Sequence, residues 1–156
     1  MIPVRVAAVT PSEMSMVRIL FEEYWKSFGF SPCFQAFDVE LAGLPGGYAP
    51  PGGRLALAFD DAEPVGCIAL RRIDPRRCEA KRLYVKPAWR RRGAGRALLA
   101  WVIAEAKAAG YSELLGDTMP YMDTALAMYE RMGFQRAEPY SPSPAPDAIY
   151  LRLVLS

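Results

Sequence analysis

The spacing of apolar positions changes several times along the chain, and each change predicts a structural element. Apolar residues alternate with other residues from Ile2 to Val6, which indicates a strand. Val17, Leu20 and Phe21 then recur at helical spacing and predict an amphipathic helix that ends near Trp25. Such a stripe is typical of a helix packed on a core, so we expect these side chains to be buried.

The start of this first helix carries its own sequence signal. Thr10 is expected to be the N-cap and Pro11 the first helical residue. Glu13 stands where a side chain can reach back to the N-cap amide, as in a capping box. These three positions together predict a defined helix start.

Further along, short alternating runs predict strands, and longer helical runs follow them. Residues 55–59 and 65–70 flank a turn and predict an antiparallel hairpin, and Glu79 to Val85 predicts a third strand. The apolar period then lengthens, which predicts a helix from a glycine-rich loop to near Gly110. Strands that first meander and then cross over through helices indicate a mixed sheet. The last elements expected are a strand at Leu114-Leu115, a helix over Asp123–Met132, and strands over Phe134–Ala137 and Ala148–Leu155.

The segment from Phe28 to Gly53 interrupts this pattern with two clusters of Pro and Gly. A short helix from about Asp38 to Ala42 is expected inside it. A segment this long in a small domain is usually functional or disordered, and its aromatic residues Phe34, Phe37 and Tyr48 argue against disorder. We therefore interpret it as a lid on the substrate side, with a plainly packed loop as the alternative.

Composition narrows the class of protein. The 156 residues are 52% hydrophobic, which fits a single domain over residues 1–156 with a sizeable core. A formal net charge of only +2 argues against nucleic acid as a partner. Cys33, Cys67 and Cys78 are odd in number and lack C-x-x-C spacing, so a cytoplasmic location is expected rather than a disulfide framework. No run approaches the ~20 apolar residues that span a bilayer, so no membrane partner is expected.

The chain contains no histidine at all. This absence excludes Ser-His and Cys-His nucleophilic catalysis. It also excludes the common metal sites that use histidine, so no metal is expected. Any acid–base chemistry must therefore use carboxylates, Tyr, Cys, Lys or water.

The strongest functional signal is the run Arg90-Arg91-Arg92-Gly93-Ala94-Gly95-Arg96, which lies between a strand and a helix. Amides at a helix start have no intrahelical partners, and the helix dipole places partial positive charge there, so a phosphate fits. Gly93 and Gly95 remove Cβ atoms that would hold a pyrophosphate away from these amides, and the arginines can add charge-assisted contacts. A solvated basic turn that needs glycine only for tightness is the alternative.

Two motifs stand in order along the chain. The first is Leu83-Tyr84-Val85-x-Pro87-x-x-Arg90-x-x-Gly93-x-Gly95-x-x-Leu98-Leu99, and the second is Ala125-x-x-x-Tyr129-x-x-x-Gly133-Phe134. Together they resemble the cofactor motif and the second signature of the GCN5-related N-acetyltransferase (GNAT) superfamily. A Rossmann domain is disfavoured because the loop follows several strands and Leu98 stands where a further glycine is needed.

The resemblance implies an α/β (α+β) GNAT fold with a mixed, mostly antiparallel sheet of about six to seven strands and about four helices. It also implies a sheet that splays between its fourth strand, Glu79 to Val85, and its fifth, near Leu114 to Asp117. Acetyl-CoA, the implied cosubstrate, would place its pantetheine arm in that wedge. Backbone groups of Leu83 and Val85 would bond the arm as they would bond an added strand. The pyrophosphate would rest on Arg90 to Arg96.

The same resemblance implies direct attack of an amine on the thioester, which needs a base, oxyanion donors and an acid for the thiolate. Tyr129 matches the family's acid, with packing against the sheet as the alternative. Glu79 is the expected base, directly or through water, and the alternative is a charged strand end or a salt bridge with Lys81 or Arg82. Further candidates are Asp117 and Glu113 for the base and a backbone N–H near Leu83 or Tyr84 for the oxyanion donor.

The acceptor is the least determined part of this interpretation. An amine of a small molecule or a peptide is expected, and a homodimer is left open. Glu22, Glu23, Asp38 and Glu40 make the lid region attractive to a cation, and we expect Asp38 and Glu40 to contact the acceptor. Two alternatives are a catalytically idle coenzyme A-binding sensor or scaffold and a module that binds nucleotide phosphates, but the presence of Tyr129 favours an enzyme.

Overall fold

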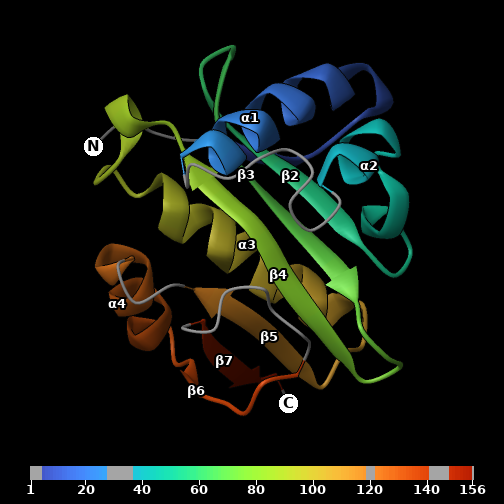
Figure 1. Ribbon diagram of the computed structural model, residues 1–156, viewed down its shortest axis with the longest axis vertical. Helices are drawn as coiled ribbons and strands as arrows, with labels where there is room; N and C mark the ends of the chain where they lie inside the picture. The colour runs from blue at the N-terminus through green and yellow to red at the C-terminus, as the bar shows by residue number, and fades with distance from the viewer. Residues whose placement is uncertain (1–4, 28–36, 119–121, 141–147, 156) are drawn as a thin grey trace.

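The computed structural model describes residues 5–27, 37–118, 122–140 and 148–155 (Figure 1). In this part of the chain, seven strands form one sheet in the order β1-β2-β3-β4-β5-β7-β6. Neighbouring strands are antiparallel except for β4 and β5, which run parallel. The strands are β1 Arg5–Ala8, β2 Arg54–Asp60, β3 Glu63–Arg72, β4 Arg77–Val85, β5 Glu113–Thr118, β6 Gln135–Arg136 and β7 Ile149–Val154.

Helices cover both faces of the sheet. Two of them pack on the face that we call the α1–α2 face, and two pack on the opposite, α3–α4 face. The mixed, mostly antiparallel sheet and its flanking helices confirm the fold expected from the sequence. The four α-helices of the described residues are α1 Met14–Lys26, α2 Phe37–Ala42, α3 Ala94–Ala108 and α4 Asp123–Arg131, and single 3₁₀ turns lie at Pro11–Glu13, Gly46–Tyr48 and Pro87–Trp89.

The central strands are buried on both faces. Leu57 and Phe59 of β2 join the core under α1 and α2, whereas Ala56 and Ala58 join the core under α3. Successive side chains of a strand point to opposite faces, so the two helical layers bury every position of this strand except its two end residues. This double burial explains why the hairpin reads as nearly continuous apolar runs.

Gly66 on β3 lets α3 lie close to the sheet. A Cβ at this position would lie 2.9 Å from the Tyr84 carbonyl oxygen and 3.1 Å from Leu98 Cδ1. A Cβ atom in a folded protein does not lie this close to other heavy atoms, so any residue larger than glycine would force α3 or β4 to move. This contact sets the depth at which the start of α3 sits beside the end of β4.

The sheet opens between β4 and β5. The parallel pairing covers only Arg77–Glu79 of β4 against Glu113–Leu115 of β5, and both strands continue beyond it. Past Glu79, β4 also contains a bulge, because Ala69 of β3 pairs with Lys81 whereas Cys67 pairs with Tyr84. One extra residue therefore lies on β4 in the region where it leaves β5, and the splayed sheet expected between the fourth and fifth strands is confirmed.

The predicted start of the first helix is confirmed, and the predicted start of β4 is not. The Thr10 amide donates to Glu13 Oε1 at 3.0 Å, and the helix begins as one 3₁₀ turn with Pro11 in its first position. β4 begins at Arg77 rather than Glu79, because Asp74 Oδ1 accepts the amides of Arg76 and Arg77 and starts the strand earlier. Glu79 is therefore the third residue of the strand and is buried.

The first predicted strand lies only partly within the described residues. The predicted strand residues Ile2 to Val4 lie outside the described residues, and the strand is described from Arg5. Among the described residues, no helix is both long enough and apolar enough to cross a bilayer.

Candidate active site

The predicted phosphate loop joins the end of β4 to the start of α3. Gly93 is the N-cap of α3 and has a φ of 88°, a left-handed conformation that only glycine adopts without strain. Its neighbour Arg91 also has a positive φ, 64°. No side chain caps the first turn of α3, so its first amides keep their hydrogen-bonding capacity for a ligand. The loop therefore has the backbone shape that an anion site requires.

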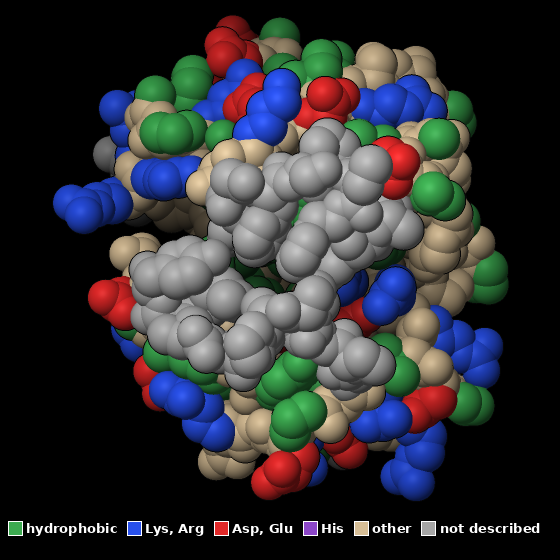
Figure 2. All heavy atoms as spheres, in the orientation of Figure 1, with side chains coloured by type: hydrophobic (Ala, Val, Ile, Leu, Met, Phe, Trp, Pro, Cys, Tyr) green, Lys and Arg blue, Asp and Glu red, His purple; other side chains and the backbone are tan. Residues whose placement is uncertain are grey.

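The loop arginines differ in what they contact. Arg91, Arg92 and Arg96 are exposed, and Figure 2 shows Lys and Arg side chains gathered at the left edge, where Figure 1 places the loop before α3. Arg90 instead donates from Nε to the Val85 carbonyl at 2.8 Å, and its guanidinium lies 5.7 Å from the centre of the Tyr84 ring. Arg90 therefore fixes the exit of β4, while the others remain available to phosphate oxygens.

Gly95 lies at the mouth of the opening between β4 and α4. A Cβ at this position would lie 3.7 Å from Met128 Sδ of α4 and 3.8 Å from a methyl of Val85 at the end of β4. These are ordinary contact distances, so the protein fold alone does not require glycine here. A bulky side chain would nevertheless fill the space through which a pyrophosphate reaches the α3 amides. Ala94, the first residue of α3, is buried and contributes its backbone.

The diverging end of β4 presents backbone groups rather than side chains to the opening. Beyond Glu79 its β5-side edge has no strand partner, so an extended ligand can add there as a strand would. The side chain of Leu83 packs toward the α3–α4 core, and that of Tyr84 turns to the other face, where its hydroxyl donates to Glu23 Oε1 at 3.1 Å. The Val85 carbonyl oxygen already accepts a hydrogen bond from Arg90 Nε. The Val85 amide is therefore the backbone group of this residue that could bind a ligand.

Tyr129 lies on the α3–α4 face, against β5. Its ring packs edge-on against Phe134, with centroids 5.0 Å apart, and a Cβ on Gly116 would lie 3.7 to 3.9 Å from its phenol atoms. The hydroxyl makes no hydrogen bond within the described residues. Burial is the main cause that raises the pKa of Tyr129, with smaller contributions from Tyr24 and Asp117. Tyr129 therefore stays protonated at neutral pH and can donate.

Glu79 forms a salt bridge, which was the alternative to its expected role as the base. It is only 1% exposed, and its Oε1 accepts Arg71 Nε at 2.6 Å and lies 2.5 Å from Arg71 Nη2. The partner is thus Arg71 on the neighbouring strand β3, where the register places it opposite Glu79, rather than Lys81 or Arg82. Removing Glu79 from this ion pair would leave a buried charge without its partner, so the pair holds the carboxylate in place.

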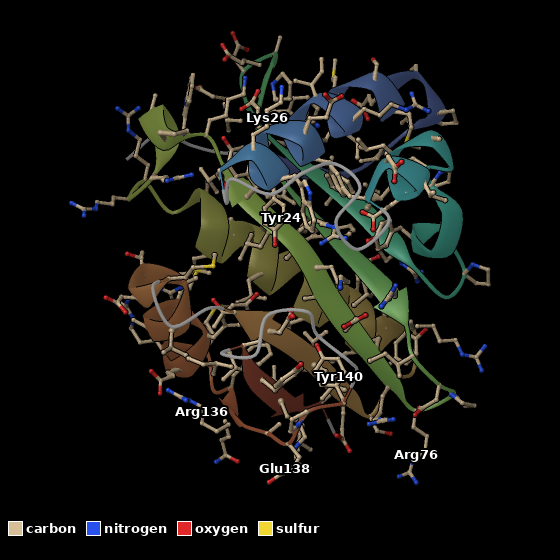
Figure 3. The ribbon with its side chains drawn as sticks, in the orientation of Figure 1. Tyr24, Lys26, Arg76, Arg136, Glu138 and Tyr140 are labelled. Atoms are coloured by element: carbon tan, nitrogen blue, oxygen red, sulfur yellow. The ribbon has the colours of Figure 1, made fainter. Side chains whose placement is uncertain are left out.

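A cluster of polar side chains lies where β4 and β5 separate, on the α1–α2 face. Desolvation raises the pKa of Asp117, and the nearby Lys81 lowers it only in part. Desolvation likewise lowers the pKa of Lys81, against the opposing effect of Glu79. The Asp117 side chain is exposed, so solvent can reach its carboxylate. Figure 3 shows two tyrosines near the same gap, Tyr24 reaching from α1 and Tyr140 lying over β5.

The β4 bulge carries a buried arginine that the sequence analysis did not single out as a site residue. Arg82 has a φ of 61° and donates to both oxygens of Glu40 on α2, at 2.9 and 2.7 Å. Three aromatic rings surround its guanidinium at 5.2 to 5.8 Å, within cation–π range. They belong to Tyr24, Trp25 and Phe37. The Arg82 carbonyl accepts the Cys67 thiol at 3.3 Å, so side chain and backbone are both fixed.

The described part of the predicted lid is packed rather than open. Phe37 stacks on Trp25 with centroids 4.6 Å apart and is 1% exposed, and Tyr48 is 4% exposed. Glu40 is bound to Arg82, and Asp38 accepts the amide of the next residue. These positions support the packed-loop alternative, and Phe34 lies outside the described residues.

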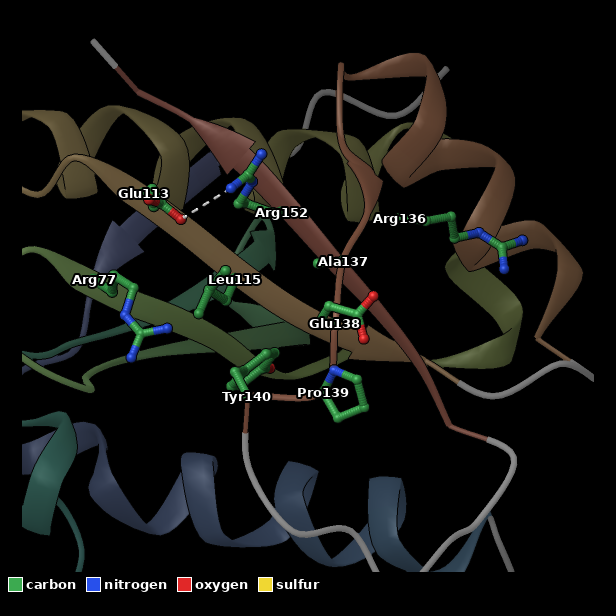
Figure 4. A pocket seen from close by; sticks show the side chains of 9 residues that line it. All are labelled: Arg77, Glu113, Leu115, Arg136, Ala137, Glu138, Pro139, Tyr140 and Arg152. Carbon is green, nitrogen blue, oxygen red and sulfur yellow. Dashed lines mark ion pairs between the residues drawn. The ribbon is translucent and has the colours of Figure 1, made fainter.

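A second hollow lies over the paired end of β4 and β5. Figure 4 shows this pocket of about 460 Å³, with Glu113 and Arg152 forming a loose ion pair of 3.9 Å across it. Glu113 therefore stands at the closed end of the junction, away from the opening, and the structure does not bring it to the other candidate residues. No sequence pattern predicts this pocket, because its lining comes from β4, β5, β6, β7 and the segment after β6.

Known proteins provide an independent comparison. The sequence profile of the Acetyltransferase (GNAT) family matches residues 17–134. The chain is 35% identical over 152 residues to an uncharacterized N-acetyltransferase of Schizosaccharomyces pombe. The aligned region covers 96% of this chain and 93% of that protein. A GNAT acetyltransferase from Staphylococcus aureus has the same fold, with a TM-score of 0.82 at 21% identity over 99% of this chain and all of the other.

A further structure carries the cosubstrate. YncA from Salmonella typhimurium, solved with its cofactor acetyl-CoA, has a TM-score of 0.73 at 16% identity over 98% of this chain and 94% of that chain. These comparisons show that this chain belongs to the GNAT family and is an N-acetyltransferase. The described residues contain no group of three or more His, Cys, Asp or Glu side chains that could hold a metal.

Proposed function

We propose that the protein acetylates an amine of a small molecule or peptide by direct attack on acetyl-CoA, without a covalent enzyme intermediate. The observation that carries this proposal is the opening between β4 and β5. It begins directly after Glu79, runs past the bulge at Arg82, and ends beside the uncapped start of α3 at Gly93. An elongated thioester with a phosphate-bearing tail fits such a path.

The protein would hold acetyl-CoA mainly with backbone groups. Amides of Ala94 and Gly95 at the start of α3 would bind the pyrophosphate, and Arg91, Arg92 and Arg96 would add charge-assisted contacts. The free edge of β4 from Leu83 to Val85 would bind the pantetheine amides. The bulge turns part of this edge out of the regular ladder, so an amide of Leu83 or Tyr84 is available to the developing oxyanion.

Tyr129 is the proposed acid. It lies on the α3–α4 face beside β5, where the leaving sulfur would pass between the strands. Burial raises its pKa, which on its own makes the phenol a weaker proton donor. The same desolvation disfavours a thiolate, whose acid has a pKa of about 8.5 in water, so the two effects offset each other. Tyr129 would then bind the developing thiolate by a charge-assisted hydrogen bond and pass it a proton.

The described cysteines do not suggest an acyl-enzyme route. Burial raises the pKa of Cys78 to about 12 and also raises that of Cys67. A thiol must lose its proton to be nucleophilic, so both are poor nucleophiles at neutral pH. Direct transfer instead needs a carboxylate that takes a proton from the amine, and Glu79 and Asp117 are the carboxylates nearest to the opening.

The experiment that tests the cofactor site is calorimetry on Gly93→Asp and Gly95→Asp. Both changes place a negative charge where the pyrophosphate would bind, and Gly93→Asp also strains a backbone with positive φ. Loss of acetyl-CoA binding in folded variants is the expected result. Undiminished affinity in both variants would place the cofactor elsewhere. A panel of amines with detection of released thiol then identifies the acceptor.

A further inference from the structure

We infer that Asp117 is the general base that removes the proton from the acceptor amine, a role that rests on the acetyl transfer proposed above. Asp117 lies on β5 two residues beyond Leu115, the last residue paired with β4. Its neighbour Gly116 faces Tyr129, because a Cβ there would lie 3.7 Å from the phenol ring. Alternation along the strand therefore places Asp117 on the opposite, α1–α2 face.

This arrangement separates the two proton transfers. The incoming amine and the leaving sulfur occupy different positions around the carbonyl carbon, so their base and acid must not compete for the same space. Gly116 and Asp117 are consecutive residues of β5. Tyr129 packs over Gly116 on one face of the strand, and the Asp117 carboxylate lies on the opposite face. A carbonyl held between β4 and β5 would meet the base on one side of the sheet and the acid on the other.

Asp117 suits this role better than Glu79 because of its surroundings. Glu79 is buried and bound to Arg71, whereas Asp117 is exposed and has no ion pair within 4.0 Å among the described residues. A base must bind a proton in each turnover and then release it to solvent. Only the free, solvent-reached carboxylate can do both without first breaking an ion pair.

The proton balance of the reaction is complete with these groups. Asp117 takes one proton from the ammonium form of the acceptor and releases it to solvent. The neutral amine nitrogen forms the C–N bond as the C–S bond breaks. The nitrogen releases its second proton to solvent as the amide forms, and Tyr129, which has passed its own proton to the leaving sulfur, takes one back from solvent. The net products are the acetylated amine, free coenzyme A and one proton.

The pH behaviour of Asp117 depends on groups from every neighbouring element. Desolvation is the largest influence on its pKa and raises it, while Lys81 and Arg82 lower it and Glu79 raises it further. A raised pKa makes a carboxylate a stronger base, and activity should fall as the pH drops through it. The charged or titratable groups around Asp117 are Glu79, Lys81 and Arg82 of β4, Tyr24 of α1, Tyr129 of α4, Tyr140 after β6, and Tyr150, its pair on β7.

The test compares Asp117→Asn with Glu113→Gln. Glu113 lies on the same strand and the same face, but at the paired end of the junction. With an amine found by the panel, Asp117→Asn should lower kcat/KM at pH 7 by about 10²–10⁴-fold and remove the acidic limb of its pH profile. The deficit should narrow as the pH approaches ~10, where a simple alkyl amine loses its proton in solution. Glu113→Gln should keep the wild-type profile.

A second readout does not depend on activity. Carboxyl ¹³C NMR of the free protein should show one aspartate that titrates above the usual range, and this resonance should vanish in Asp117→Asn. Calorimetry should give the same acetyl-CoA affinity for both variants and the wild type. If the wild type acetylates an amine and Asp117→Asn keeps the acidic limb, Asp117 is not the base. If the wild type binds acetyl-CoA but acetylates no amine, the proposed function itself fails, and the assignment of the base with it.

Discussion

The two faces of the sheet are held together by different kinds of contact. On the α3–α4 face, aliphatic side chains such as Leu98, Leu99 and Val102 fill the core by volume alone. On the α1–α2 face, aromatic rings dominate the core, and they enclose the ion pair of Arg82 with Glu40. The first face carries the proposed cofactor loop, and the second faces the proposed acceptor.

This difference suits the proposal that one fold combines a cofactor site on one face with an acceptor site on the other. Apolar packing tolerates exchange of side chains of similar volume, so other aliphatic residues of the same size could hold α3 in place on the α3–α4 face. A buried ion pair requires both of its partners, because removing one leaves an uncompensated charge. Contacts between distant segments can therefore alter the acceptor side without altering the cofactor side.

The largest effect is expected at Tyr129, whose loss should affect chemistry and little else. Tyr129→Phe keeps the ring against Phe134 and Gly116 but removes the hydroxyl. The kcat should fall by about 10²–10⁴-fold, as is typical of a lost general acid. Single-turnover transfer should slow with it, while calorimetry should find acetyl-CoA affinity nearly unchanged. A wild-type single-turnover rate would make Tyr129 a packing residue.

The second-largest effect is expected on the α1–α2 face, and it concerns the stability of the protein. Arg82→Met leaves Glu40 without its partner, and we expect the free energy of unfolding to fall by about 3–5 kcal/mol in urea titrations. The double variant Arg82→Met/Glu40→Leu should recover much of this loss, because apolar residues can replace a buried pair. Equal stabilities of the single variant and the wild type would show that the pair adds nothing to the α1–α2 face.

A smaller effect is expected from Gly66→Ala, which tests the close approach of α3. The added methyl would meet the Tyr84 carbonyl at 2.9 Å, so unfolding should become about 1–3 kcal/mol easier. The matched control is Gly47→Ala, where no atom beyond the adjacent residues lies within 4 Å of the new methyl. Thermal unfolding should separate the two variants, and equal effects would contradict tight packing at Gly66.

The smallest effect is expected from Tyr84→Phe. This change removes the hydrogen bond from the hydroxyl to Glu23 on α1, worth about 0.5–1.5 kcal/mol of unfolding free energy. Acetyl-CoA affinity should be unchanged, because only the backbone of Tyr84 lies on the cofactor side. A clear loss of affinity in calorimetry would show that the two faces are coupled through this side chain.

The cofactor side of the site could be read from the sequence because it is local. The end of β4, the glycine loop and the first turn of α3 form one continuous run, and the φ of 88° at Gly93 has glycine as its sequence signal. Tyr129 could be placed by the spacing of its own motif. The packing of both helical layers also followed from the periods of the apolar residues.

The bulge in β4 has no comparable signal in the sequence. A positive φ usually marks glycine, asparagine or aspartate, whereas β4 places Arg82 there. Nothing near Arg82 in the chain shows that it is buried, because Glu40 lies 42 residues away. Its conformation depends on an ion pair and aromatic rings that exist only once α1 and α2 have packed on the sheet.

The sequence by itself determined the family and the order of elements, and it predicted the proposed cofactor loop, because each depends on residues that are neighbours along the chain. Tertiary structure alone decided which carboxylates are free. Glu79 and Asp117 are both strand residues with no distinguishing sequence context, yet the β3–β4 register gives Arg71 to Glu79. The parallel pairing of β4 with β5 stops before Asp117 and leaves it in the opening. Register is a property of two strands together, so one strand's sequence does not contain it.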